Sequence, residues 1–399
     1  MDKYLSRYAE TEANLALDIV PAATYQHVLV IPCFSETTAF LKRLLNGPLG
    51  LTSALVIVVI NQNHDHSEPL NETLLQYFAQ FPLLWQQQHL SLRSSPIDST
   101  SNLHWLVVNR CHNQLHLPKK QGVGLARKIG CDIALALIAQ HHIISPWVHS
   151  SDADAHLPAD YFDLPKDEHV AAVYQFAHIQ ACSSEAIWQA TQRYETALRY
   201  YIAGLRWAGS PYTQQPIGSL LAFKAEAYCA ARGFPKRSAG EDFYLLNKLC
   251  KLGPVYNPKA QVQLEARVSE RVPFGTGPAV KAIAALEDPE SQYLYYAPET
   301  FVALKQWLDR LPEVWPRLQQ GTLPLADLPQ PVQNALLDAG VEKLWPHLLQ
   351  QARDNEAGTR MLHNWFDAFQ TLKFIRRLQN QCYPERPLSL SLKLAPFTC

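Results

Sequence analysis

The chain has 399 residues, of which 47% are hydrophobic and 18% charged, and its formal net charge is −1 at pH 7. These values exclude a disordered chain and do not indicate a basic surface for nucleic acid, so no nucleic-acid partner is expected. The length is sufficient for one large α/β domain and a second, smaller unit.

The N-terminal segment and the cysteines indicate the cellular compartment of the protein. The first 20 residues carry acidic side chains throughout and lack the apolar core of a signal peptide. The most apolar run, residues 54–60, is too short to span a bilayer. The eight cysteines show no CxxC spacing, which predicts free thiols in a reducing compartment. We therefore expect a cytoplasmic protein without a transmembrane segment, whose oligomeric state is open.

Continuous apolar runs mark the expected strands. Residues 27–32 and 54–60 read as buried strands. Between them we expect a helix that is capped by Ser35 and ends at residues 46–48. Further strands are expected at residues 103–109, 171–176 and 220–223. Such strands, separated by helices, predict a mostly parallel sheet with both faces covered.

Apolar residues at spacings of three and four mark the expected helices. In the first part of the chain these are residues 122–142, 184–208, 224–232 and 241–252. Beyond about residue 280 the strand signals fade, and residues 301–311 and 361–378 read as amphipathic helices. We therefore expect a first domain at residues 1–279 and a helical C-terminal extension at residues 280–399.

Asp152 and Asp154 follow an apolar run with one small residue between them. In extended backbone alternate side chains point to the same side, so the two carboxylates can converge on one hard cation. Mg²⁺ and Mn²⁺ prefer such oxygen ligands and commonly also bind substrate phosphates. The same pair in isolation also suits a solvated acidic turn, so the metal interpretation requires a second signal.

Further motifs occur in a defined order around this pair. Pro32-Cys33-Phe34-Ser35-Glu36 and Gly122-Val123-Gly124-Leu125-Ala126-Arg127 precede it, and Gly218–Lys224, Gly233-Phe234-Pro235 and Glu241-Asp242 follow it. In this combination, over about residues 27–257, the chain resembles the family 2 glycosyltransferases. The resemblance implies a GT-A fold and a nucleotide-sugar donor. It also implies transfer to a hydroxyl acceptor, a site for Mn²⁺ or Mg²⁺, and inversion if Asp242 is the base.

The resemblance also implies roles for individual residues. Asp154 would hold the cation, and Asp152 would share the metal or face the donor. Asp242 would be the general base that accepts the proton of the attacking hydroxyl, with Glu241 as the fallback. Acidic residues in the first turn of a helix also stabilise its dipole, which is the competing explanation for the last pair.

The expected donor pocket lies at the carboxyl ends of the strands, where α/β sheets bind ligands. Its expected members are Pro32, Ser35, Glu36, Asn61, Arg127 and Asp152. Arg127 would pair with donor phosphate. Asn61 stands where the family usually has an acidic residue that reads the nucleobase, so uridine, guanosine and thymidine donors all stay open.

The segment from Arg267 to Gly277 contains two arginines and a Gly-x-Gly sequence. It is neither a P-loop nor a dinucleotide-binding fingerprint. An active-site loop that closes over phosphates and an ordinary surface loop both fit it.

Three other function classes compete. A nucleotidyltransferase could use the same carboxylate pair, but the sequence after the first strand lacks its Gly-rich loop. A phosphatase would place its DxD nucleophile at the end of the first strand. A non-catalytic module that binds a sugar nucleotide or a partner stays open.

Overall fold

A computed structural model describes the chain except for residues 20–23, 64–68, 96–101, 113, 182 and 269–274. The described chain forms two compact units, residues 1–183 with 216–277 and residues 184–215 with 278–399. The sequence analysis grouped residues 184–215 with the first domain, whereas they pack in the same unit as the C-terminal helices. The domain boundary expected at residue 280 stays a prediction.

The first unit is built on a nine-stranded sheet. Its strands, in spatial order, are β11 (Val255–Tyr256), β8 (Ala171–Val173), β10 (Leu221–Lys224), β6 (Trp147–Ser150), β1 (His27–Cys33), β2 (Ala54–Asn61), β5 (Leu103–Arg110), β4 (Leu90–Ser94) and β3 (Leu83–Gln87). Of these described strands, only β10 and β4 run opposite to the rest. The predicted mixed α/β class with a mostly parallel sheet is confirmed.

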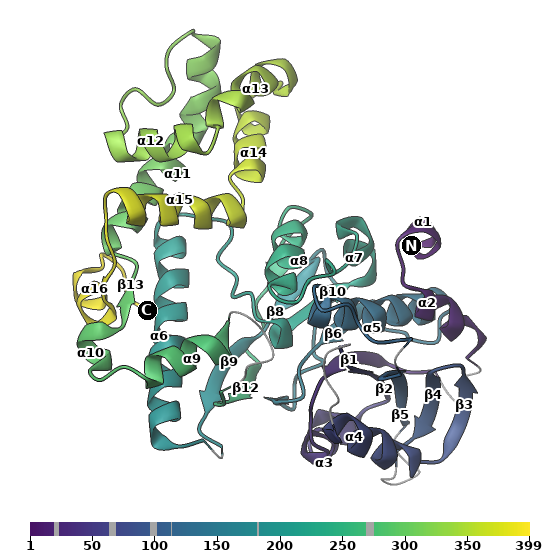
Figure 1. Cartoon of the computed structure of the whole chain (residues 1–399). Helices are drawn as coiled ribbons and strands as arrows, with labels where there is room; N and C mark the ends of the chain where they lie inside the picture. The colour runs from purple at the N-terminus through teal and green to yellow at the C-terminus, as the bar shows by residue number, and fades with distance from the viewer. Residues whose placement is uncertain (20–23, 64–68, 96–101, 113, 182, 269–274) are drawn as a thin grey trace. The chain divides into compact units, whose positions relative to one another are not determined.

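The central strands are buried along nearly their whole length because helices cover both faces (Figure 1). All residues of β2 are buried, and so are six of the seven in β1. The helices of this unit are α1 (Asp2–Arg7), α2 (Thr11–Leu15), α3 (Ala39–Leu45), α4 (Pro69–Ala79), α5 (Gly122–Ala139), α7 (Ala225–Ala231) and α8 (Glu241–Leu249). In Figure 1, α2 and α5 lie on one face of the sheet and α3 and α4 on the other.

A second sheet extends the first unit next to the carboxyl end of β6. It contains β7 (Ala155–His156), β12 (Gln261–Glu265) and β9 (Gln175–Ile179). β12 pairs antiparallel with β7, with Leu264 opposite Ala155, and parallel with β9. This pairing brings the chain that follows β12 back beside Asp154.

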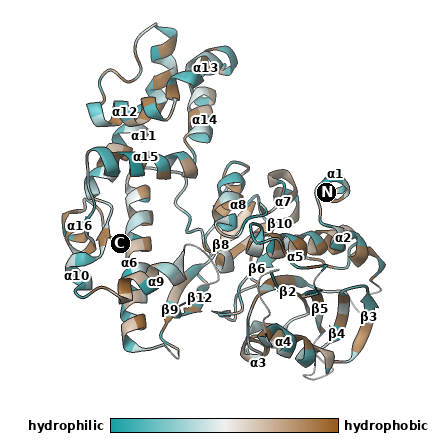
Figure 2. Cartoon of the chain, in the orientation of Figure 1, coloured by the Kyte–Doolittle hydropathy of each residue, from teal (hydrophilic) through white to brown (hydrophobic). Residues whose placement is uncertain are grey.

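The second unit is helical. Its helices are α6 (Glu185–Trp207), most of α9 (Thr276–Ala284), α10 (Pro289–Gln292), α11 (Pro298–Gln319), α12 (Gln330–Asp338), α13 (Trp345–Gln351), α14 (Asn355–Trp365), α15 (Ala368–Gln381) and α16 (Leu388–Leu394). A two-stranded antiparallel sheet of β13 (Leu294–Tyr295) and β14 (Arg386–Pro387) lies among them. Apolar and polar bands alternate along α6, α11 and α15 in Figure 2, as expected of amphipathic helices. The predicted helical C-terminal region is confirmed.

Two sequence expectations about helices were wrong in detail. Ser35 does not cap a helix, because α3 begins only at Ala39, after Thr38. The helix expected at residues 361–378 is two helices, α14 and α15. Asp367 stands between them and accepts hydrogen bonds from the backbone N–H groups of Phe369 and Gln370, so it starts α15 as an N-cap.

Among the described helices, none has both the length and the apolar character needed to cross a membrane.

Close packing of α5 on the sheet depends on Gly130. A Cβ atom at this position would collide with Cγ1 of Val30 in β1 and would lie 3.2 Å from Cγ2 of Val59 in β2. We therefore expect Gly130→Ala to destabilise the protein by about 1–3 kcal/mol, the usual cost of overpacking. Urea unfolding measures this loss. Val30→Ala in the same chain should recover part of it, and strictly additive effects of the two substitutions would contradict the packing explanation.

Candidate functional site

The guanidinium group of Arg127 lies at the centre of a buried ion-pair cluster. Its Nε atom donates to Glu241 Oε1 at 3.0 Å, and its Nη2 atom donates to Asp152 Oδ1 at 2.6 Å. Its Nη1 atom donates to Ser150 Oγ at 2.9 Å and to the Ser151 carbonyl at 3.2 Å. Arg127 is 3% exposed. One side chain of α5 therefore joins the end of β6 to the start of α8.

Arg127 keeps its charge in this buried position. Burial alone lowers the pKa of an arginine, but the neighbouring carboxylates of Asp152 and Glu241 outweigh it and raise the pKa above its ordinary value. Every guanidinium nitrogen already donates to a protein group. The donor-phosphate role expected for Arg127 stays a prediction, since a phosphate would have to compete with these partners.

Two glycines make the position of Arg127 possible. A Cβ atom at Gly218 would collide with the guanidinium group, and one at Gly124 would lie 2.7 Å from the Arg237 carbonyl. The backbone N–H of Gly124 donates to that same carbonyl at 2.9 Å. The two Gly-containing motifs of the sequence thus have a packing reason: Gly218 lets the chain before β10 approach Arg127, and Gly124 lets α5 approach residues 235–237.

Asp242 lies beside this cluster at the start of α8. Burial and the adjacent Glu241 raise the pKa of Asp242 to about 7, despite a 2.7 Å hydrogen bond from the Phe243 N–H and the nearby Arg127. Glu241 is itself held by Arg127 and is 4% exposed. Asp242 therefore has a pKa suited to exchanging a proton near neutral pH.

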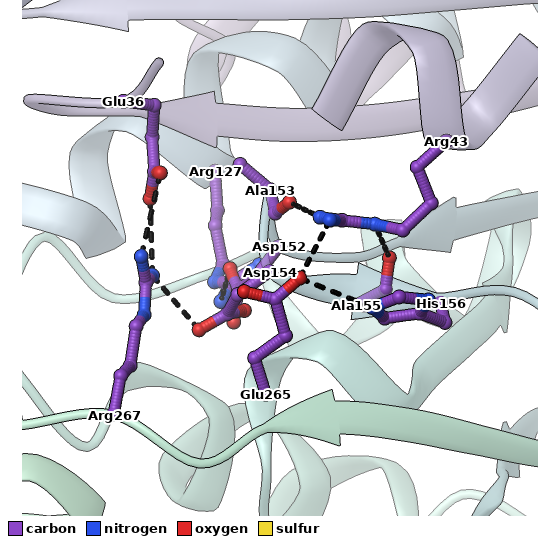
Figure 3. Close-up of polar contacts among 10 residues, drawn as sticks. All are labelled: Glu36, Arg43, Arg127, Asp152, Ala153, Asp154, Ala155, His156, Glu265 and Arg267. Atoms are coloured by element: carbon purple, nitrogen blue, oxygen red, sulfur yellow. Dashed lines mark hydrogen bonds and ion pairs between the residues drawn. The ribbon is translucent and has the colours of Figure 1, made fainter. Parts of the chain in front are cut away.

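Asp154 belongs to a second ion-pair group (Figure 3). Arg267, which follows β12, places Nη2 2.8 Å from Asp154 Oδ2 and 3.1 Å from Glu36 Oε1. Glu36 lies just beyond the end of β1. The carboxylates of Asp152 and Asp154 are therefore each paired with a different arginine.

A third group supports the turn that carries the two aspartates (Figure 3). Arg43 of α3 donates to the backbone carbonyls of Ala153 and Ala155 and pairs with Glu265 Oε1 at 2.6 Å. His156 Nε2 lies 3.1 Å from the same Glu265 oxygen. Arg43 therefore holds the backbone of this turn through carbonyl groups rather than through the aspartates themselves.

The expected donor-pocket residues at the ends of β1 and β2 lie together. Pro32 is buried in β1 beyond the last residue that pairs with β6, where its missing N–H costs no ladder bond. Asn61 is 5% exposed, and its side-chain amide donates to the Cys33 carbonyl at 2.9 Å. Asn71 donates to the Asn61 carbonyl and accepts from the Ser35 N–H. Base reading by Asn61 stays a prediction.

His149, two residues before Ser151, does not face this cluster. It is fully buried and lies against the rings of His27, Tyr161 and Phe162. Burial lowers the pKa of His149 to about 3, so the ring is neutral at physiological pH. It is a core residue of β6.

Within the described part of the chain, no group of three or more His, Cys, Asp or Glu side chains is arranged to hold a metal ion. A Mg²⁺ site that uses one or two carboxylates together with substrate phosphates needs no third protein ligand. The carboxylates of Asp152 and Asp154 fit that kind of site. Because each is already paired with a guanidinium group, any cation must compete with an arginine for them.

Several residues of the site escaped the sequence analysis. Arg43, Glu265 and Asn71 were assigned no role, and the strand β12 that positions Glu265 was not predicted. The alternation of Val262 and Leu264 with polar neighbours was the available signal for that strand. Nothing in the sequence indicates the partners of Arg43, because they lie 110 or more residues away.

No protein-family model matches the sequence, and no curated protein matches it. Among solved structures, the chain is similar to S. aureus TarS residues 1–349 in complex with UDP-GlcNAc, at 13% identity over 86% of this chain and 91% of that one, with a TM-score of 0.39. It is also similar to a mycobacterial protein, at 12% identity over 73% and 84% of the two chains, with a TM-score of 0.26. TM-scores this low assign neither a shared fold nor an activity to the chain.

Gly218→Ala tests whether the Arg127 cluster is under tight steric control. The added methyl group collides with the guanidinium, so we expect a loss of about 1–3 kcal/mol in the free energy of unfolding. Gly47→Ala is the matched control, because a Cβ there meets no atom closer than 3.4 Å. Urea unfolding measures both variants. Equal stability of the Gly218 variant and the wild type would show that the arginine is not confined.

The raised pKa of Asp242 makes stability depend on pH. The folded state holds the Asp242 proton up to about pH 7, whereas the unfolded chain releases it near pH 4. The resulting contribution to stability is complete below about pH 4 and is lost as the pH rises through 7. Asp242→Asn should therefore gain stability relative to the wild type between pH 4 and 8.

Thermal or urea unfolding across this range measures the difference. Asp309→Asn, at an aspartate whose side chain is 62% exposed, is the control. A constant difference between Asp242→Asn and the wild type at all pH values would contradict the raised pKa.

Proposed function

We propose that the protein is a glycosyltransferase that moves a sugar from a nucleotide-diphosphate sugar to a hydroxyl acceptor. The observation that carries the proposal is the Arg127 guanidinium group, which binds Asp152 and Glu241 at once. It joins the candidate donor-binding Asp152, at the carboxyl end of β6, to the Glu241-Asp242 pair that contains the candidate base. This edge of a parallel sheet is where α/β proteins bind ligands.

The chemistry requires a base and a means of stabilising the leaving group. In the proposed reaction the acceptor oxygen attacks the anomeric carbon, the bond from that carbon to the diphosphate oxygen breaks, and the bonding electrons leave with the nucleoside diphosphate. Asp242 accepts the proton of the acceptor hydroxyl. A base on the side opposite to the leaving group implies inversion at the anomeric carbon.

A divalent cation, Mn²⁺ or Mg²⁺, would supply Lewis-acid stabilisation of the diphosphate when bound. Asp154 would hold it, with Asp152 at its side. Asp152 is oriented by Arg127 and keeps 32% of its side-chain surface exposed, which supports a role toward a ligand. Asp242, rather than Glu241, is proposed as the base, because Glu241 is engaged by Arg127.

The order of the motifs along the chain supports a GT-A-like, family 2-like enzyme. The first strand contains Pro32 and is followed by Glu36, the Arg127 helix precedes the two aspartates, and the Glu241-Asp242 pair opens a later helix. The contacts of Arg127 link the last three of these motifs, which supports a shared donor site.

A thermal-shift screen with UDP, GDP, dTDP and their sugar conjugates, with and without Mn²⁺, tests the proposal. One nucleotide family should raise the melting temperature in the presence of Mn²⁺, because a ligand of the folded state stabilises it. That nucleotide sugar should then be turned over, by transfer or by slow hydrolysis. Asp242→Asn should retain the shift and reduce turnover by about 10²-fold or more, the usual contribution of a general base.

Arg199→Met, which removes an exposed ion pair on α6, is the control for both measurements. If the protein binds none of these nucleotides, the proposed function is wrong. If Asp242→Asn turns over the donor as fast as the wild type, Asp242 is not the base. If the protein releases diphosphate from a nucleoside triphosphate and a sugar phosphate, it is a nucleotidyltransferase instead.

A further inference from the structure

Arg267 is placed between two carboxylates that come from different elements. Its Nη2 atom lies 2.8 Å from Asp154 and 3.1 Å from Glu36, and its Nη1 atom lies 3.4 Å from Glu36. The side chain is 32% exposed, against 21% for Asp154 and 11% for Glu36. The pairs are therefore open to solvent on the side of Arg267.

The strand register brings Arg267 to this position. β12 pairs with β7 so that Leu264 lies opposite Ala155, and the Glu265 N–H approaches the Asp154 carbonyl at 3.4 Å. Arg267 follows two residues later and so reaches the Asp154 side chain. The sequence was compatible with either an active-site loop or an ordinary surface loop at Arg267. In the structure this arginine lies at the candidate donor site.

Arg267 differs from Arg43 and Arg127 in how easily its protein partners can be replaced by a ligand. Arg127 is 3% exposed and is held by four protein acceptors. Arg43 donates to two backbone carbonyls, which cannot turn away. Among the described residues, Arg267 in contrast contacts the carboxylate ends of Glu36 and Asp154, which belong to rotatable side chains, so a competing anion can replace one of them.

The charge of the site makes such a replacement depend on a cation. Six carboxylates (Glu36, Asp152, Asp154, Glu241, Asp242 and Glu265) and three guanidinium groups (Arg43, Arg127 and Arg267) make up its described ionic groups. Even with Asp242 protonated, carboxylates outnumber guanidinium groups. A diphosphate adds negative charge, so it is accepted more easily when a cation takes over one of these carboxylates.

We propose that Arg267 exchanges partners when the donor binds. In the donor-free protein it neutralises Asp154. Asp154 would then hold a divalent cation that enters with a nucleoside diphosphate, and Arg267 would donate its N–H groups to diphosphate oxygens, while Glu36 keeps the guanidinium oriented. Arg267 is then both a competitor of the free cation and a ligand of the leaving group. This inference rests on the proposed function and assigns the diphosphate contact within it.

The exchange predicts opposite effects of one substitution on two binding reactions. In Arg267→Met, free Mn²⁺ should bind about fivefold more tightly, because its competitor for Asp154 is gone; that factor corresponds to about 1 kcal/mol, the value of a partly exposed ion pair. Pyrophosphate in the presence of saturating Mn²⁺ should bind about tenfold or more weakly, since a charge-assisted contact is lost.

Mn²⁺ binding is measured by electron paramagnetic resonance of the free ion, and pyrophosphate binding by calorimetry, on the full chain. Pyrophosphate is the probe because it does not depend on the nucleobase. Arg267→Lys should restore most of the pyrophosphate affinity, and Arg199→Met should change neither reaction. Asp154→Ala should remove the gain in Mn²⁺ affinity when it is combined with Arg267→Met.

Two outcomes overturn the inference. If both affinities are unchanged in a folded Arg267→Met protein, Arg267 is a structural ion pair only. If the wild type binds pyrophosphate equally well with Mn²⁺ and with a chelator, Arg267 replaces the cation and no exchange takes place. Failure of the proposed function is distinct from both, because then the wild type binds neither pyrophosphate nor any nucleotide of the screen.

Discussion

The candidate site depends on one buried guanidinium group. A charge taken out of water is costly, so a buried arginine is stable only when nearby carboxylates and acceptors satisfy it fully. Arg127 meets this condition with Glu241, Asp152, Ser150 and the Ser151 carbonyl. Removing one partner of such a pair leaves an uncompensated buried charge, which commonly costs about 3–5 kcal/mol. The ends of β6 and α8 are therefore held together by an interaction that tolerates little change.

The same interaction sets the electrostatics of the neighbouring groups. Arg127 pairs with the carboxylates of Glu241 and Asp152. Burial of Asp242, together with the adjacent Glu241, outweighs the nearby Arg127 and raises the pKa of Asp242 to about 7. Arg43 fixes the turn of the two aspartates through its backbone carbonyls, so their side chains are spared for other partners. Arg267 meets Asp154 from the other side. Three arginines thus have three separate tasks: a buried anchor, a backbone support, and an exchangeable partner.

The strongly patterned elements were predictable from the sequence. β1 and β2 are continuous apolar runs because both of their faces are covered, and α5 shows a clear apolar periodicity. The short strands β7 and β12 were missed, since they contain two and five residues and their patterning is weak. The break between α14 and α15 was missed as well, because the apolar spacing continues through Asp367 while that residue starts a new helix as its N-cap.

The sequence by itself determined the order of the chemical groups: two aspartates after an apolar strand, an arginine early in a glycine-containing helix, and a Glu-Asp pair that opens a later helix. Only the tertiary structure decided which charge faces which. Arg127 pairs with residues 25 and 114 positions away, and Arg267 pairs with Glu36 across 231 positions. Ion pairs of this kind follow from strand order and register. The spacing of residues along the chain does not predict either of these. For that reason the sequence could indicate a candidate donor site, whereas the pairing of Arg267 with Asp154 became visible only in the folded protein.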